Sequence, residues 1–136
     1  MSWDIFVQDI PAEAITVSDI PVGFVPRPIG TRTDIIAAIQ DIIPFADVSD
    51  PYWVRVRSPE LDLEIGLGKH EPLMGFAFHV RGGDLAPGAI AAVLTKLNLR
   101  AFDPGSDSGI FDVASAAGSL ERWRRYRNLV LVRANT

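Results

Sequence analysis

Five short stretches of the chain are predicted to be β-strands, the first three because apolar and polar residues alternate with the two-residue period of a strand that has one buried face. The stretches cover residues 3–7, 52–57, 61–67, 73–81 and 99–102. Pro11 follows the first stretch and ends it. Ser58-Pro59-Glu60 separates the second from the third as a hairpin loop would, and a turn segment at 68–72 precedes the fourth. The middle three strands are therefore predicted to form an antiparallel meander.

A period of three to four residues predicts three helices, over residues 34–43, from about 87 to 97, and from about 119 to 128. Thr31 and Asp34 fit a capping box before the first helix. Pro87 is tolerated in the first turn of the second helix, and Asn98 is suited to a left-handed C-terminal cap. One side of the third helix carries Leu120, Trp123 and Tyr126. Residues 129–132 either extend this helix or form a last strand.

The order of these elements predicts an α+β fold. We expect a mostly antiparallel sheet of about five strands, with two to three helices packed on one face. A length of 136 residues suits a single domain over residues 1–136. The connection at about 9–31 is too rich in proline for a long helix or a central strand. Its apolar residues predict that it is anchored across the core; they are Ile10, Ile15, Val17, Ile20, Val22, Phe24 and Val25.

Composition narrows the class of protein. Hydrophobic residues make up 48% of the chain and charged residues 22%, which is typical of a globular protein and not of a disordered or membrane-spanning one. The absence of cysteine removes disulfides, thiolate nucleophiles and cysteine-bound metals. The opening residues show no signal-peptide pattern and no apolar run is long enough to span a bilayer, so we expect a cytoplasmic protein without membrane contact. No motif implies a cofactor or a metal.

Charge is distributed unevenly along the chain. The formal net charge is −4, with 11 acidic and 5 basic residues in 1–70 but 6 acidic and 8 basic residues in 71–136. This balance argues against general binding to nucleic acid or to anionic membranes. Arginine alternates with aromatic residues in 122–127, but helical spacing turns Trp123 and Tyr126 toward the core, so the arginines are expected to form a solvated face. Glu121 and Arg125 are spaced as a favourable pair on that face.

The predicted meander sorts its side chains into an apolar side and a charged side. A four-residue loop would place Arg57 opposite Asp62 and Arg55 opposite Glu64. His79, on the next strand, would then lie beside Asp62 or Glu64, depending on the register of that strand. The residues expected on the charged side are Trp53, Arg55, Arg57, Asp62, Glu64, His79 and Arg81.

This charged side allows three interpretations. His79 with Asp62 or Glu64 is a candidate general base, beside arginines that would hold an anionic substrate. The commoner alternative is a solvated face with cross-strand ion pairs, each worth about 0.2–1 kcal/mol. Finally, Trp53 with Arg55, Arg57 and Arg81 has the composition of a protein-binding hot spot.

Other motifs in the sequence are weaker. Gly82-Gly83-Asp84 precedes a helix as anion-binding loops do, but Asp84 would repel an anion, so an ordinary turn is expected. Asp103, Asp107 and Asp112 lack the spacing of a calcium loop and are typical of turns.

Several segments resemble a family of small, uncharacterised bacterial proteins. The resemblance is carried by Ser2-Trp3-Asp4-Ile5-Phe6-Val7 and Phe76-Ala77-Phe78-His79-Val80-Arg81-Gly82-Gly83-Asp84, with Ser49-Asp50-Pro51, Leu99-Arg100-Ala101 and Arg122-Trp123. It covers nearly the whole chain and implies a bacterial, intracellular, stand-alone domain. It implies no activity, cofactor or catalytic residue.

From the residues, we expect a non-enzymatic protein-interaction module, of which an antitoxin or immunity-type protein is one example, acting on a protein partner or as a homo-oligomer. The alternative is a small enzyme or a binder of an anionic ligand, with its site around His79.

Overall fold

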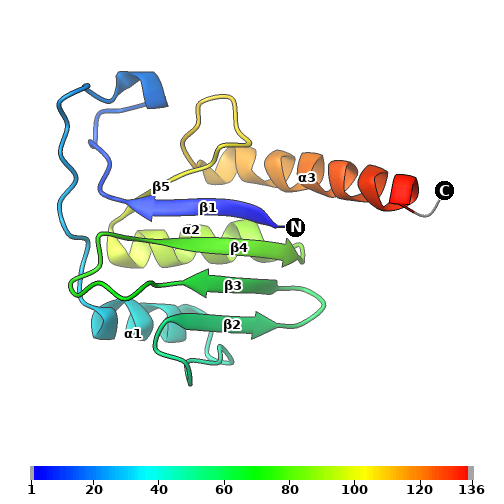
Figure 1. Cartoon of the computed structure of the whole chain (residues 1–136), viewed down its shortest axis with the longest axis horizontal. Helices are drawn as coiled ribbons and strands as arrows, with labels where there is room; N and C mark the ends of the chain where they lie inside the picture. The colour runs from blue at the N-terminus through cyan, green and yellow to red at the C-terminus, as the bar shows by residue number, and fades with distance from the viewer. Residues whose placement is uncertain (1, 135–136) are drawn as a thin grey trace.

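The computed structural model of the chain describes residues 2–134, and the side chains of residues 2–130. Within this range the chain folds into a five-stranded antiparallel sheet with the spatial order β2-β3-β4-β1-β5 (Figure 1). The strands are β1 (Trp3–Gln8), β2 (Trp53–Arg57), β3 (Asp62–Gly66), β4 (Gly75–Gly82) and β5 (Arg100–Phe102). The predicted α+β fold and its meander are confirmed.

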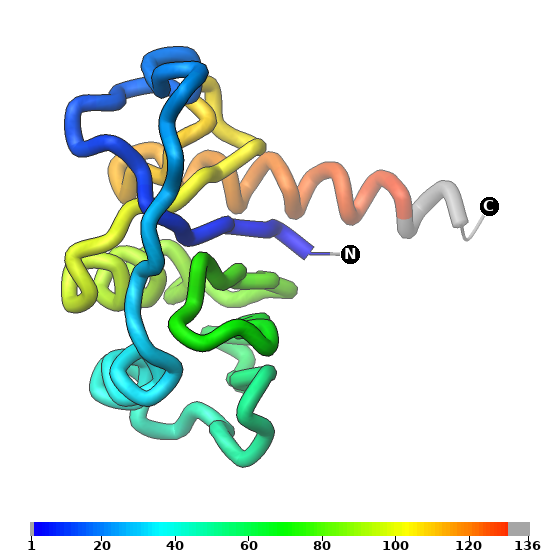
Figure 2. The backbone as a smooth tube through the Cα atoms, turned by 60° about the vertical axis from the view of Figure 1, so that its left-hand side comes forward, coloured from blue at the N-terminus to red at the C-terminus, as the bar shows by residue number. Residues whose placement is uncertain are grey.

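Among residues 2–134, three α-helices accompany the sheet: α1 (Arg32–Ile42), α2 (Ala86–Leu97) and α3 (Val113–Ala134), with a short 3-10 helix η1 (Val17–Asp19). The first two lie against one face of the sheet, and α3 lies next to α2 and projects past the strands (Figures 1 and 2). The Thr31 hydroxyl accepts from the Asp34 N–H at the start of α1, as the capping pattern predicts. Asn98 ends α2 in the left-handed conformation, with φ 52° and ψ 47°. No helix within residues 2–134 is long and apolar enough to cross a membrane.

The hairpin between β2 and β3 has the predicted register. Arg57 lies opposite Asp62 and Arg55 opposite Glu64. Leu63, between the two acids, is fully buried, so the predicted division into an apolar and a charged side is confirmed. The apolar side faces α1 and α2 and forms the core with residues of all five strands; its largest fully buried side chains include Phe78, Ile5, Ile35, Ile39, Leu63, Ile65 and Ile90.

The proline-rich connection is held at both ends and partly exposed between them. It is held at its start, where Ile10 and Ala14 pack with Ile110, and at its end, where Gly30 pairs with Leu73. Between these points it crosses the ends of the strands on its way to α1 (Figure 2). Ile20 also packs against the first of these clusters, whereas four of the apolar residues of the connection are exposed: Ile15, Val17, Val22 and Val25.

The third helix is longer than its prediction. It begins at Val113 and not near Ser119, because the Asp112 carboxylate accepts from the N–H of Ala114 and acts as a cap six residues earlier. It continues to Ala134, so residues 129–132 extend the helix and form no last strand. Leu120 is buried, whereas Tyr126 is 60% exposed and does not pack in the core.

Candidate functional site

The face of the sheet opposite α1 and α2 is uncovered by any helix of the described chain, and we call it the open face (Figure 1). Strand alternation places on it the side chains of Asp4, Phe6, Trp53, Arg55, Arg57, Asp62, Glu64, Ala77, His79 and Arg81, with Gly66 among them. All seven residues that the sequence predicts for the charged side therefore lie on one surface.

A row of charged residues crosses four strands of the open face. The pairing of the strands places Arg55 opposite Glu64, Glu64 opposite His79, and His79 opposite Asp4. The Nδ1 atom of His79 lies 2.8 Å from an Asp4 carboxylate oxygen, within hydrogen-bond distance. Ser2 donates to the same oxygen. The acid that fixes the imidazole is thus Asp4, on the neighbouring strand β1.

Glu64 is occupied by arginines. One of its carboxylate oxygens lies 3.2 Å from Arg57 and 3.0 Å from Arg81, and its side chain is only 18% exposed. Asp62 pairs with Gly82, and the register of β3 against β4 shifts immediately after it, so Asp62 stands outside the row that contains His79. Of the two acids expected near His79, the structure places Glu64 next to it and Asp62 apart from it.

A second row of the open face is aromatic and interrupted by small residues. Trp53 lies opposite Gly66, Gly66 opposite Ala77, and Ala77 opposite Phe6. The Trp53 indole covers Gly66, where a Cβ atom would lie 3.1 Å from the indole ring. The same indole lies 5.9 Å from the imidazole of His79, measured between ring centroids. Trp53 is therefore held in place by Gly66 and His79 while it remains 38% exposed.

The small residues leave a hollow of about 310 Å³ at the end of the open face where β4 begins. Its lining includes Gly66, Gly75 and Ala77 together with the exposed side chains of Phe6 and Met74. A Cβ atom on Gly75 would lie only 2.7 Å from the carbonyl oxygen of Val7, so the close approach of β4 to β1 here requires glycine. His79 is adjacent to this hollow and is not part of its lining.

Two residues of the site, Asp4 and Phe6, are missing from the sequence-based candidates. Their alternation with Trp3 and Ile5 already places them on the side opposite the core. What the sequence does not supply is that β1 inserts between β4 and β5, which brings residues 75 positions apart into contact.

The weaker motifs have structural roles. Arg125 is exposed and lies 3.7 Å from Glu121, as expected, whereas the side chain of Arg124 is only 25% exposed and pairs with Asp84 at 2.7 Å. Asp103 is buried and accepts hydrogen bonds from the Trp3 indole and the Gly105 N–H in the turn after β5. Within residues 2–134 no cluster of three or more histidine and acidic side chains is arranged to hold a metal ion.

Comparison of the chain with protein-family models, with curated proteins and with solved structures finds no match. The function of the chain is therefore inferred from the geometry of the open face.

Proposed function

We propose that this protein is a non-enzymatic binding module whose open face recognises another protein. The observation that supports it is the combination, on one uncovered face, of exposed aromatic side chains, a hollow with small residues in its lining, and an adjoining row of charges. Phe6 and Trp53 are 41% and 38% exposed, and Met74 beside them is 45% exposed. Exposed aromatic side chains next to arginine are typical of the centre of a protein interface.

The charges of the open face indicate the chemistry of the partner. On β1 to β4, Arg55, Arg57 and Arg81 are balanced by Asp4, Asp62 and Glu64, so these four strands bring both signs to the open face in equal number. A nucleic acid or an anionic membrane would meet as many negative as positive groups here, which disfavours both. A protein segment that inserts an apolar side chain into the hollow and presents charges of both signs beside it fits better.

The same contacts favour protein binding over the alternative of a catalytic or anion-binding site at His79. An anion would have to displace Glu64 from Arg57 and Arg81, which already hold its carboxylate. His79 is paired with Asp4 and packed beside Trp53, and the hollow on this face is lined by other residues.

A matched pair of substitutions tests the proposal. Ala77→Arg places a long charged side chain in the hollow, whereas Ala37→Arg makes the same change on the exposed side of α1, away from the open face. Wild-type protein and both variants are immobilised and exposed to an extract of the source cells, after circular dichroism has confirmed that all three fold. We expect one protein of the extract to bind equally to the wild type and to Ala37→Arg, and at least about tenfold less to Ala77→Arg.

Retention of the same proteins by all three forms would refute the proposal. The oligomeric state is measured in parallel by light scattering. A dimer that Ala77→Arg dissociates and Ala37→Arg does not would identify the partner as a second copy of this chain.

A further inference from the structure

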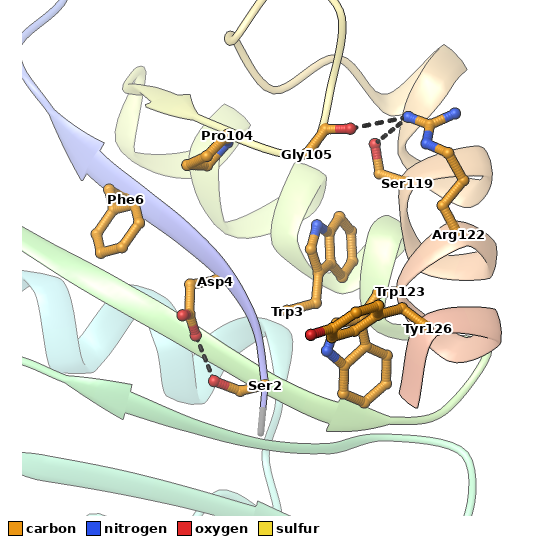
Figure 3. Close-up of a pocket in the computed structure, with 10 residues that line it drawn as sticks. All are labelled: Ser2, Trp3, Asp4, Phe6, Pro104, Gly105, Ser119, Arg122, Trp123 and Tyr126. Carbon is orange, nitrogen blue, oxygen red and sulfur yellow. Dashed lines mark hydrogen bonds between the residues drawn. The ribbon is translucent and has the colours of Figure 1, made fainter. Parts of the chain in front are cut away.

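A second hollow, of about 360 Å³, lies between β1 and α3 (Figure 3). The short strand β5 pairs with β1 only along Phe6–Gln8, and the hollow lies beside the remaining N-terminal half of β1. Its lining combines four aromatic side chains with one acidic and one basic side chain: Trp3, Phe6, Trp123, Tyr126, Asp4 and Arg122. This hollow shares Phe6 with the hollow on the open face, and its other lining residues are different. The function proposed above does not require it.

Aromatic side chains form the walls of the hollow, and they differ in how firmly they are held. Trp3 is 4% exposed, and its indole N–H donates to Asp103 at 3.1 Å, so its ring is fixed. The guanidinium of Arg127 covers one face of the Trp123 ring at 4.9 Å from the centroid. Tyr126 stands at the rim and is largely exposed. Walls of this kind bind a flat ring by stacking, and they gain little from a flexible aliphatic chain.

The two charged residues of the hollow come from its two sides, Asp4 from β1 and Arg122 from α3 (Figure 3). The Asp4 hydrogen bonds to Ser2 and His79 are both made to the Oδ1 atom, which leaves Oδ2 as an acceptor for a ligand. Arg122 uses Nη2 to donate to the carbonyl of Gly105 at 3.0 Å. One negative and one positive group favour a neutral ligand with donors on one edge and acceptors on another over a ligand with a net charge of either sign.

The Trp123 side chain lines the hollow and carries an unpaired donor. Its indole N–H is buried and has no hydrogen-bond partner in the described part of the chain. A buried donor without an acceptor is unfavourable and rare in folded proteins. Because this N–H has almost no exposed surface, a ring nitrogen or carbonyl oxygen of a ligand in the hollow would accept from it only after the Trp123 ring turns toward the ligand. The hydrocarbon ring of an aromatic amino acid offers no such acceptor.

We propose that this hollow binds a planar nitrogen heterocycle of the nucleobase class. The ring would stack on the aromatic walls, an N–H edge would donate to Asp4, and a ring acceptor would take the hydrogen bond of Trp123. A free nucleoside and a base of a single-stranded nucleic acid share this chemistry, and the experiment below separates the two.

The test uses the three indole N–H signals of nitrogen-15-labelled protein, which arise from Trp3, Trp53 and Trp123. The probes are guanosine, a short single-stranded RNA that contains guanosine, and L-phenylalanine. We expect guanosine to shift the Trp3 and Trp123 signals in a saturable manner and to leave the Trp53 signal unchanged, because Trp53 lies on the open face and does not line this hollow. If only the RNA shifts the Trp3 and Trp123 signals in a saturable manner, the same site is supported, and the base comes from a nucleic acid.

Variants locate the binding. Trp123→Phe keeps a ring and removes the N–H, and we expect it to weaken guanosine binding roughly tenfold. Tyr126→Ala changes a largely exposed side chain, so the fold is retained, and loss of its stacking is expected to weaken binding by a similar factor. Arg125→Ala, on the exposed side of α3 and outside the hollow, is the control that leaves affinity unchanged.

Three results would overturn the proposal. The first is that neither guanosine nor the RNA moves the Trp3 and Trp123 signals of the folded protein at millimolar concentration. The second is that L-phenylalanine binds more tightly than guanosine. The third is that guanosine binding is unaffected by both Trp123→Phe and Tyr126→Ala.

Discussion

Leu63 and Glu64 are neighbours in β3 that point to opposite sides of the sheet, and their substitution by alanine tests the division of the sheet into a core face and an open face. Leu63 is fully buried between β2 and β4, opposite Val56 and Val80. Removing its branched end leaves a cavity that these strands cannot close, so Leu63→Ala should lower the free energy of unfolding by about 3 kcal/mol.

Glu64→Ala removes two ion pairs, to Arg57 and Arg81. The side chains of these arginines are 61% and 45% exposed, so both regain water when the carboxylate is removed. The loss should therefore be about 1 kcal/mol or less. Both substitutions introduce alanine at adjacent positions of one strand. The difference between their losses of unfolding free energy therefore reports which face of the sheet each side chain occupies, and not the β-propensity of alanine.

Equilibrium unfolding in urea measures both variants against the wild type, with the slope of the transition checked for two-state behaviour. A cost for Glu64→Ala as large as that for Leu63→Ala would show that the open face is covered in solution. A cost below about 1 kcal/mol for Leu63→Ala would show that this strand does not face the core.

Three further substitutions test local features of the fold by the same unfolding measurement. Gly83→Ala should cost at least about 2 kcal/mol, because Gly83 has φ +101° and a Cβ atom would lie 2.2 Å from the carbonyl oxygen of Glu60; a neutral effect would refute this backbone conformation. Asn98→Gly should be neutral or stabilising and Asn98→Ala should cost about 1 kcal/mol, and the reverse order would contradict the left-handed cap. Hydrogen bonds from the hydroxyl and the N–H of Ser49 lower the pKa of Asp47. Asp47→Asn should therefore lower stability above the unfolded-state pKa, and this loss should disappear as the pH falls through the lowered folded-state pKa. A loss of stability that persists in acid would contradict this assignment.

Much of the fold follows from local patterns. The β2–β3 hairpin is specified by strict alternation on both sides of a four-residue loop, so even its register is predictable: Arg57 meets Asp62 as expected. The start of α1 at Thr31 and the left-handed Asn98 are likewise set by single residues with strong preferences. These features depend only on residues close together in the sequence.

Features that depend on distant segments are not predictable in this way. The pairing of His79 with Asp4 requires β1 to lie beside β4, and no local pattern specifies the order of strands in a sheet. The exposure of Val22 in the proline-rich connection also cannot be predicted from its hydrophobicity, because the rest of the fold decides whether the core has room for it. The first turns of α3 are not predicted because Gly118 and the small residues around it form no clear helical pattern. The Asp112 cap stabilises these turns.

The central claim, that the open face binds a protein, is tested most directly by photo-cross-linking in the source cells. A photoreactive phenylalanine analogue replaces Phe6, which is on the open face, or Phe45, which lies outside it and is 61% exposed. Both replacements preserve an aromatic ring, so the fold is expected to tolerate each. We predict a discrete cross-linked species of higher mass from position 6 and none from position 45. Equal cross-linking from both positions, or none from position 6, would contradict the claim.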